Sequence, residues 1–300
     1  MRDRRGKIRV LSLLLFFWSL LFSLPLTAFE WPLAEQRLLM SFGQNKWGGF
    51  LKAVALQGES GEIYPVEEGE ILFVRRESGL PDKHGLGAGL GTMVVMQHQR
   101  GIRSLYGNID SLQNPGKLNF RREDVLALMK PESDSTEGYL YLQIIDSEVD
   151  RYINPLLSLP SLDDRRAPVI RSVFLVDESG RTYSPETGSV LNQGSYKLLI
   201  ETYDPSSATE NGTAMAPFSI KVYLNGVEMH GLSFESIVIK EGQSLVIGAR
   251  EYAYQNLYRG LDEYSFEPLV LRNGEAELEL VVSDFSGNET VEVYQLQVRR

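Results

Sequence analysis

Short apolar runs, separated by glycine, proline and charged residues, recur along the chain and predict β-strands. Residues 92–98 form a continuous apolar run, which is typical of a strand buried on both faces. Residues 276–282 alternate apolar with acidic residues, the pattern of a strand with one face on the core. Strands at this spacing, with glycine and proline turns between them, indicate an all-β fold. The other predicted strands are 62–66, 70–74, 102–106, 123–128, 139–144, 169–176, 196–203, 218–224 and 291–298.

Three segments give other signals. Residues 34–42 predict a short helical lead, and residues 250–266, rich in tyrosine and charge, predict a long loop. The pair Asn225-Gly226 predicts a tight hairpin turn. Residues 62–66 and 70–74 flank a predicted turn at Glu68-Gly69.

A polar, charged stretch at residues 162–168 ends in proline and predicts a domain boundary. It divides the chain into a leader (1–28), a first β domain (29–162) and a second β domain (163–300). The second part contains about seven short strands, which are typical of an immunoglobulin-like β-sandwich.

The N-terminus predicts export. Five basic residues precede an apolar run over residues 10–26, and Ala28 supplies a small residue at its exit, as in a secretory signal peptide. A retained membrane anchor is the alternative, because a span needs about 20 apolar residues. Serines and a proline within the run favour cleavage after Ala28 and no stable span. No cysteine follows the leader, which excludes a lipoprotein anchor.

Charge and cysteine content narrow the class further. Removing the leader leaves 25 basic and 39 acidic residues, a net charge of −14, which disfavours nucleic acid and anionic lipid as partners. The chain has no cysteine, so disulfides and cysteine-bound structural zinc are excluded. An acidic, cysteine-free exported protein of this size is expected in the periplasm or at the cell surface of a bacterium.

Five segments between residues 41 and 157 follow one another in a familiar order: 41–43, 61–73, 91–106, 139–144 and 154–155. Together they resemble the lysostaphin/LytM-type peptidoglycan endopeptidases, whose motifs include G-x-P-V-x-A, a later Y-x-H turn and H-L-H-F-E-I followed by N-P. The resemblance implies a β-sheet core domain with a zinc groove. Residues 217–226 and 284–288 are similar to immunoglobulin-like domains that follow such peptidase domains in some bacteria.

The resemblance also places the family's zinc positions on this sequence. The ligating His and Asp, four residues apart, fall on Leu51 and Ala55, and the ligating second His of H-x-H falls on Tyr141. The two assisting His positions fall on Asn108 and Tyr139. Zinc needs nitrogen, thiolate or carboxylate donors, and a phenol with a pKa near 10 is a poor substitute. We therefore predict a pseudoenzyme with no zinc cofactor and no catalytic residue.

The chain has three histidines, which limits any relocated metal site. His84 lies in a glycine-rich stretch that lacks the lysine of a phosphate loop, and His98 is expected to be structural. His230 belongs to the predicted second domain. A rebuilt zinc site from Asp82, His84 and Asp110 stays open as an alternative.

The strand at residues 139–144 predicts which side chains line the former groove. Alternation places Leu140, Leu142 and Ile144 on the core face and the Tyr/Tyr/Gln set on the other. The tyrosines either fill the space left by the metal or act as stacking platforms for a peptide stem, a glycan or a partner strand. The candidate groove-binding residues are Tyr106, Asn108, Tyr139, Tyr141 and Gln143.

The sequence thus favours a non-catalytic, exported LytM-like protein that binds the cell wall or envelope, as a scaffold or as a regulator of hydrolases. Degenerate LytM domains activate peptidoglycan amidases in related systems, so the resemblance implies peptidoglycan or an envelope protein such as a cell-wall hydrolase as partner. Two alternatives stay open. One is an active zinc metalloendopeptidase with relocated ligands, and the other is a purely structural envelope protein.

Overall fold

The computed structural model describes residues 29–58, 60–76, 90–131, 138–185, 190–205, 214–248 and 250–300. Within these ranges the chain is all-β, as predicted, with one four-residue helix, α2 (Tyr254–Leu257), and two 3-10 turns, η1 (Gln99–Gly101) and η2 (Pro155–Leu157). None of the helices in the described ranges has the length and apolar character needed to cross a membrane. The predicted leader, residues 1–28, lies outside the described residues.

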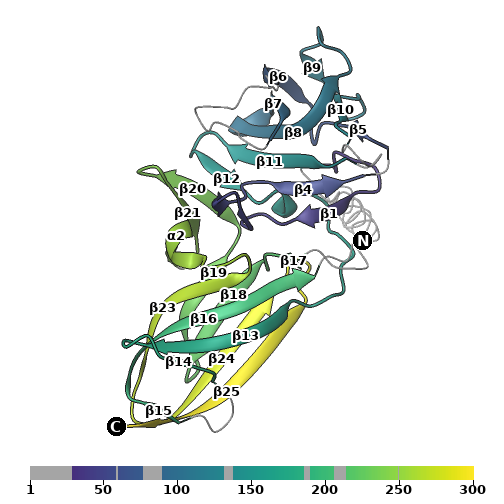
Figure 1. Cartoon of the computed structure of the whole chain (residues 1–300). Helices are drawn as coiled ribbons and strands as arrows, with labels where there is room; N and C mark the ends of the chain where they lie inside the picture. Colours follow the sequence, from purple (N-terminus) through teal and green to yellow (C-terminus); the bar gives the residue numbers. More distant parts are fainter. Residues whose placement is uncertain are drawn as a thin grey trace, which may run out of the picture.

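A 13-stranded sheet forms the upper part of the molecule in Figure 1. Its strands are β1 (Arg37–Met40), β4 (Val54–Gln57), β5 (Glu62–Ile63), β6 (Gly69–Arg75), β7 (Thr92–Gln97), β8 (Ile102–Leu112), β9 (Asn119–Phe120), β10 (Ala127–Met129), β11 (Leu140–Asp146), β12 (Arg151–Ile153), β20 (Ser236–Lys240), β21 (Gln243–Ile247) and β22 (Glu251–Ala253). The main path runs β22-β21-β20-β12-β11-β8-β7-β6-β9, and all pairings are antiparallel where β11 meets β4, β8 and β12.

Two five-stranded sheets form the lower part (Figure 1). One contains β13 (Val169–Asp177), β14 (Thr182–Tyr183), β16 (Gly194–Pro205), β17 (Ala214–Met215) and β23 (Glu263–Leu271). The other contains β15 (Val190–Asn192), β18 (Ser219–Leu224), β19 (Val227–Ser233), β24 (Gly274–Ser283) and β25 (Glu289–Arg299). Alternate residues of β16 and β24, such as Leu198 and Leu280, are fully buried in one shared core, so the two sheets pack as a sandwich.

Local sequence signals account for much of this framework. In β11, Leu140, Leu142 and Ile144 all enter the large core, as the predicted alternation requires. Asn225 and Gly226 have φ of 51° and 73° and join β18 to β19, which confirms the predicted hairpin turn.

Three local predictions were wrong. Residues 37–40 form strand β1, not a helix, because they pair with β4 and pack half-buried apolar side chains against the two hydrophobic clusters. Residues 250–266 form β22, α2 and part of β23 instead of one long loop. The predicted turn at Glu68-Gly69 does not join two paired strands, since β5 pairs with β10 while β6 pairs with β7 and β9.

The large sheet does not end at the predicted boundary near residue 162. After β19 the chain leaves the sandwich, and β20 pairs with β12, with Tyr152 opposite Ile237. Asn154 strengthens this junction, because its backbone N–H donates to Glu235 O and its Nδ2 donates to Phe234 O. Both parts of the chain therefore contribute strands to one sheet and side chains to one continuous core.

A short hairpin of β2 (Asn45–Lys46) and β3 (Gly49–Phe50) is held against the segment that carries α2. Phe50 contacts Tyr254 and Tyr258 edge to face, with ring centroids 5.4 and 5.8 Å apart. Tyr254 Oη donates to Asn45 Oδ1 at 2.7 Å. These contacts fix the orientation of the hairpin, whose turn carries Trp47.

Candidate functional site

Four of the five positions onto which the LytM resemblance places zinc-site residues lie together in a small hydrophobic cluster, separate from the large core. Ala55 on β4 is the strand partner of Tyr141 on β11, and Leu51 precedes β4 in the same cluster. Tyr139 is half-buried and packs against it. We call this the apolar cluster; its buried members are Leu51, Ala53, Ala55, Leu90, Met93, Leu105 and Tyr141.

Tyr141 is the centre of the apolar cluster. Its side chain is 1 % exposed, and burial, followed by the neighbouring Tyr139 hydroxyl, raises its pKa well above 10. The phenol therefore stays neutral in this apolar environment, which makes Tyr141 a poor zinc ligand. Leu51 and Ala55 offer no donor atom. The described side chains at these positions can pack, but they cannot activate a metal-bound water.

Asn108 lies at the rim of the same cluster and stabilises the local backbone. It is the extra residue of a β-bulge between β7 and β8, with φ of 63°, a conformation that Asn tolerates better than most residues. Its Nδ2 donates to the carbonyl of Tyr139 at 2.9 Å, and its backbone N–H donates to the carbonyl of Leu90. Asn108 thus fixes the backbone at Tyr139 through the hydrogen bond to its carbonyl.

Tyr106 does not share this face, which corrects its place among the candidate groove residues. Simple alternation would put residues 106 and 108 on one side, but the bulge at Asn108 reverses the faces. Tyr106 is fully buried in the large core, where its hydroxyl accepts from Val66 N at 2.8 Å and from Ser104 Oγ. Gln143 lies on the Tyr141 face but is only 9 % exposed.

Trp47 completes the surface and was not found from the sequence. It is 58 % exposed and has φ of 53°, in a turn with Gly48 at φ of 75°. Its ring packs edge to face on Tyr141 with the ring centroids 5.6 Å apart, and Tyr139 also packs edge to face on Tyr141, at 5.2 Å. The ammonium of Lys46 lies 5.4 Å from the Trp47 ring centre. We call Trp47, Tyr139 and Tyr141 the aromatic surface.

The aromatic surface has the features of a binding site. A large exposed ring in a left-handed turn is costly to a fold, because most residues avoid φ above zero and apolar rings favour burial. Its position is nevertheless fixed by the contact with Tyr141 and by the hairpin that carries it, which is docked on Tyr254. Such a ring can stack on a sugar face or a peptide side chain at low entropic cost. The sequence signal was limited to a Trp-Gly-Gly turn.

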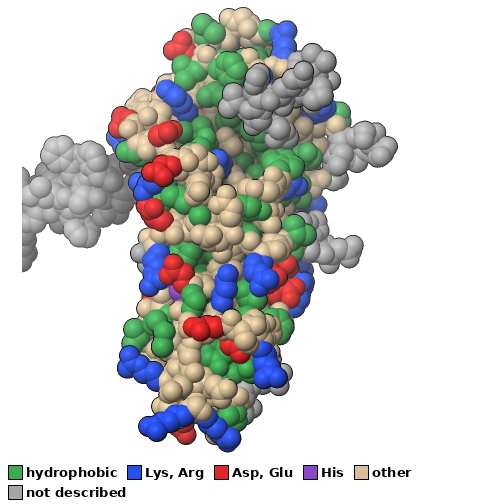
Figure 2. Space-filling view, turned by 60° about the vertical axis from the view of Figure 1, so that its left-hand side comes forward, with side chains coloured by type: hydrophobic (Ala, Val, Ile, Leu, Met, Phe, Trp, Pro, Cys, Tyr) green, Lys and Arg blue, Asp and Glu red, His purple; other side chains and the backbone are tan. Residues whose placement is uncertain are grey.

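Charges on the visible face of the protein are mixed. In Figure 2, Lys and Arg side chains are interspersed with Asp and Glu over the lower half, and hydrophobic side chains lie between them. This face therefore offers nucleic acid no continuous basic track.

The histidines do not join the aromatic surface where they are described. His98 is 5 % exposed, and its ring nitrogens bond to Glu68 O at 2.9 Å and Ser104 Oγ at 2.7 Å, a structural role. His230 is buried in the sandwich and bonds to Glu267 O. Asp110 is exposed on β8, while His84 and Asp82 lie outside the described residues.

Acid is expected to destabilise the protein partly through His98. Burial lowers the pKa of His98 below 6.5, so the folded state binds this proton less readily than the unfolded state. Its contribution to stability is present above pH 6.5 and is lost as the pH falls through that value toward the folded pKa. His98→Gln should cost about 1 kcal/mol at pH 7.5. It should also reduce the loss of stability between pH 7.5 and 5, measured by guanidinium unfolding; an unchanged loss would contradict this.

One group of acidic side chains in the described ranges could hold a metal ion. Asp164, Asp204 and Asp284 contribute carboxylate oxygens that lie within 4.8 Å of one another. None of these residues belongs to the apolar cluster or to the aromatic surface.

Comparisons with known proteins give distant similarities. One protein-family model matches residues 167–299, and no curated protein matches the chain. A zinc-containing peptidase from Vibrio cholerae is 14 % identical with a TM-score of 0.29, and the match covers 39 % of this chain and 36 % of that one.

The antimicrobial peptidase lysostaphin from Staphylococcus simulans is 10 % identical with a TM-score of 0.34. That match covers 87 % of this chain and 93 % of lysostaphin. At these TM-scores the likeness carries no conclusion about the activity of this chain.

Proposed function

We propose that this chain is a non-catalytic, exported LytM-like protein of the bacterial envelope that binds peptidoglycan through the aromatic surface. Bound there, it acts as a scaffold or as a regulator of cell-wall hydrolases. The observation that carries the proposal is the exposed ring of Trp47, held in a left-handed turn against Tyr141 and beside Tyr139.

The chemistry of the apolar cluster supports a role without hydrolysis. The resemblance to LytM-type peptidases puts zinc ligands at Leu51, Ala55 and Tyr141, and these side chains fill the position with hydrocarbon and a neutral phenol. A metallopeptidase needs three donors and an open coordination position there. Zinc is therefore not part of the proposed function.

Peptidoglycan fits the aromatic surface better than a flat protein partner does. Sugar rings present apolar faces that stack on an exposed indole, while the Lys46 ammonium beside Trp47 can pair with the carboxylates of a peptide stem. The second candidate partner is an envelope protein that docks on the same surface. Export through the predicted leader would bring the chain to either one.

Trp47→Asn tests the proposal. Asn keeps the left-handed turn, so the fold should be retained while the ring is lost. Purified residues 29–300 should bind insoluble sacculi, and the variant should bind about 30-fold more weakly, the cost of an interface tryptophan of about 2 kcal/mol. Co-sedimentation with purified peptidoglycan measures both.

Val227→Ala is the matched control, because Val227 is 62 % exposed on a hairpin of the sandwich and should not affect binding. If Trp47→Asn and the unmodified chain bind sacculi equally well, the aromatic surface is not the binding site. Stoichiometric zinc by elemental analysis, together with chelator-sensitive cleavage of the sacculi, would instead favour an active metallopeptidase with relocated ligands.

A further inference from the structure

Three aspartates from distant parts of the sequence converge between the large sheet and the sandwich. Asp164 lies in the segment that leads into β13, Asp204 is near the end of β16, and Asp284 directly follows β24. One carboxylate oxygen from each lies within 4.8 Å of the other two. Two oxygens that bind one Ca²⁺ at about 2.4 Å can be at most about 4.8 Å apart, so this spacing suits a shared cation.

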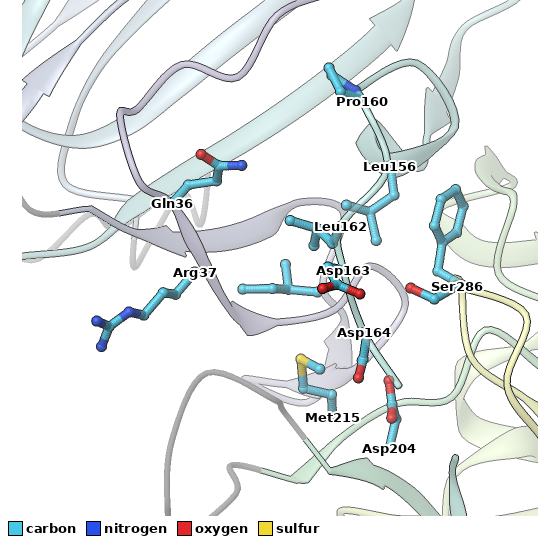
Figure 3. Close-up of a pocket in the computed structure, with 12 residues that line it drawn as sticks. Gln36, Arg37, Leu156, Pro160, Leu162, Asp163, Asp164, Asp204, Met215 and Ser286 are labelled. Atoms are coloured by element: carbon cyan, nitrogen blue, oxygen red, sulfur yellow. The ribbon is translucent and has the colours of Figure 1, made fainter. Parts of the chain in front are cut away.

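Asp204 provides the second, independent observation. Its side chain is 6 % exposed, and its Oδ1 is buried without a hydrogen-bond partner in the described part of the chain. In Figure 3 its carboxylate points at that of Asp164 across the edge of a cavity. A buried carboxylate oxygen without a donor is costly, and proteins normally satisfy such an atom.

The other two carboxylates are held in place by their own turns. Asp284 accepts from the backbone N–H of Asn288 at 2.8 Å and from its Nδ2 at 2.7 Å. The same Nδ2 donates to the carbonyl of Asp164 at 3.0 Å, and Asp164 Oδ1 accepts from Arg166 N. Asn288 therefore ties the turn after β24 to the segment before β13 and positions two ligands at once.

The charges need compensation. Asp204 and Asp284 are only 6 % and 3 % exposed, so water screens their charges poorly. A cation between the three carboxylates would compensate these buried charges. The adjoining cavity, of about 500 Å³, is open enough for water ligands. Arg37 lines the cavity but points away from the aspartates in Figure 3.

We propose that Asp164, Asp204 and Asp284 form a Ca²⁺ site. The donors are all oxygens, which suits a hard cation, and the lack of nitrogen and sulfur donors disfavours zinc. Calcium tolerates irregular geometry and water ligands, whereas Mg²⁺ demands a near-ideal octahedron. The site would fasten the segment at residues 160–168 to both sheets of the sandwich, through β16 and the turn after β24. The inference is independent of peptidoglycan binding.

The experiment uses purified residues 29–300, stripped with chelator and titrated with CaCl₂. Calorimetry should give one site per chain, and the melting temperature should rise with calcium concentration, because an ion that binds only the folded state stabilises it. Asp204→Asn should lose the calcium response. It should melt no lower than the unmodified chain without metal, because the buried unpaired charge is gone.

Asp262→Asn is the matched control, since Asp262 belongs to a different cluster, beside Arg171, and should keep the full calcium response. Absence of calcium binding at millimolar concentration in the unmodified chain would overturn the proposal. So would a calcium response that survives in Asp204→Asn. Stabilisation by protons alone, with melting raised from pH 8 to pH 5 and unchanged by calcium, would assign the cluster to a shared proton instead.

Discussion

Replacing Ala55 by aspartate is expected to lower the free energy of unfolding by more than about 4 kcal/mol, because a carboxylate would be buried without a partner. Ala55 is fully buried on β4, opposite Tyr141 and among the hydrocarbon of the apolar cluster. Guanidinium unfolding followed by tryptophan fluorescence measures the change. After removal of the leader, the remaining tryptophans are Trp31 and Trp47, both in the first part of the chain.

The control is Ala34→Asp, at an exposed position in the same part of the chain, which should change stability by less than about 0.5 kcal/mol. A triple variant extends the test. Leu51→His, Ala55→Asp and Tyr141→His together introduce the ligand types of LytM-type peptidases, and zinc should then recover stability that Ala55→Asp alone loses. If zinc leaves the triple variant unchanged, these three positions do not form a zinc geometry, and the positions that the resemblance assigns are wrong.

Phe234→Ala should cost about 3–5 kcal/mol, the usual range for a buried phenylalanine, because it empties the junction between the two parts of the chain. The Phe234 side chain is fully buried, 6.3 Å from the Phe50 ring. A Cβ placed on Gly43 would lie 2.0 Å from the Phe234 ring, so the contact there is tight. The backbone O of Phe234 accepts a hydrogen bond from Asn154 Nδ2, next to the pairing of β12 with β20.

Phe174→Ala is the matched control, since Phe174 is 37 % exposed on β13 and should lose far less. Unfolding should be followed by fluorescence and by far-UV circular dichroism together. In Phe234→Ala the two signals should separate, because the large sheet loses its support from the sandwich. A loss below about 1 kcal/mol with coincident transitions would show that the junction contributes little.

The sequence predicted features that depend on neighbouring residues. Alternation in residues 139–144 assigned Leu140 and Leu142 to the core because the period of a strand is two wherever it lies. The Asn225-Gly226 turn followed from the left-handed conformations that only a few residues adopt. The chemistry of Leu51 and Ala55 also needs no structure, because neither side chain carries a donor atom.

Other features required contacts between distant residues. Residues 37–40 became a strand because β4 was available to pair with them, which overrides local helix preference. Tyr106 lies in the large core because it pairs with Leu142 of β11 on the core face. The bulge at Asn108 separates the faces of residues 106 and 108, and no local pattern marks that bulge. The position of Trp47 on Tyr141 depends on the hairpin that docks on Tyr254.

By itself, then, the sequence determined the all-β class, the buried face of its strands and the absence of donor atoms at Leu51 and Ala55. The tertiary structure decided which side chains meet. In the folded chain β20 pairs with β12, and Trp47 packs on Tyr141. Asp164, Asp204 and Asp284 lie close together there. The reason is physical: strand period and turn conformation are local properties, whereas a site is made by residues whose separation in sequence says nothing about their distance in space.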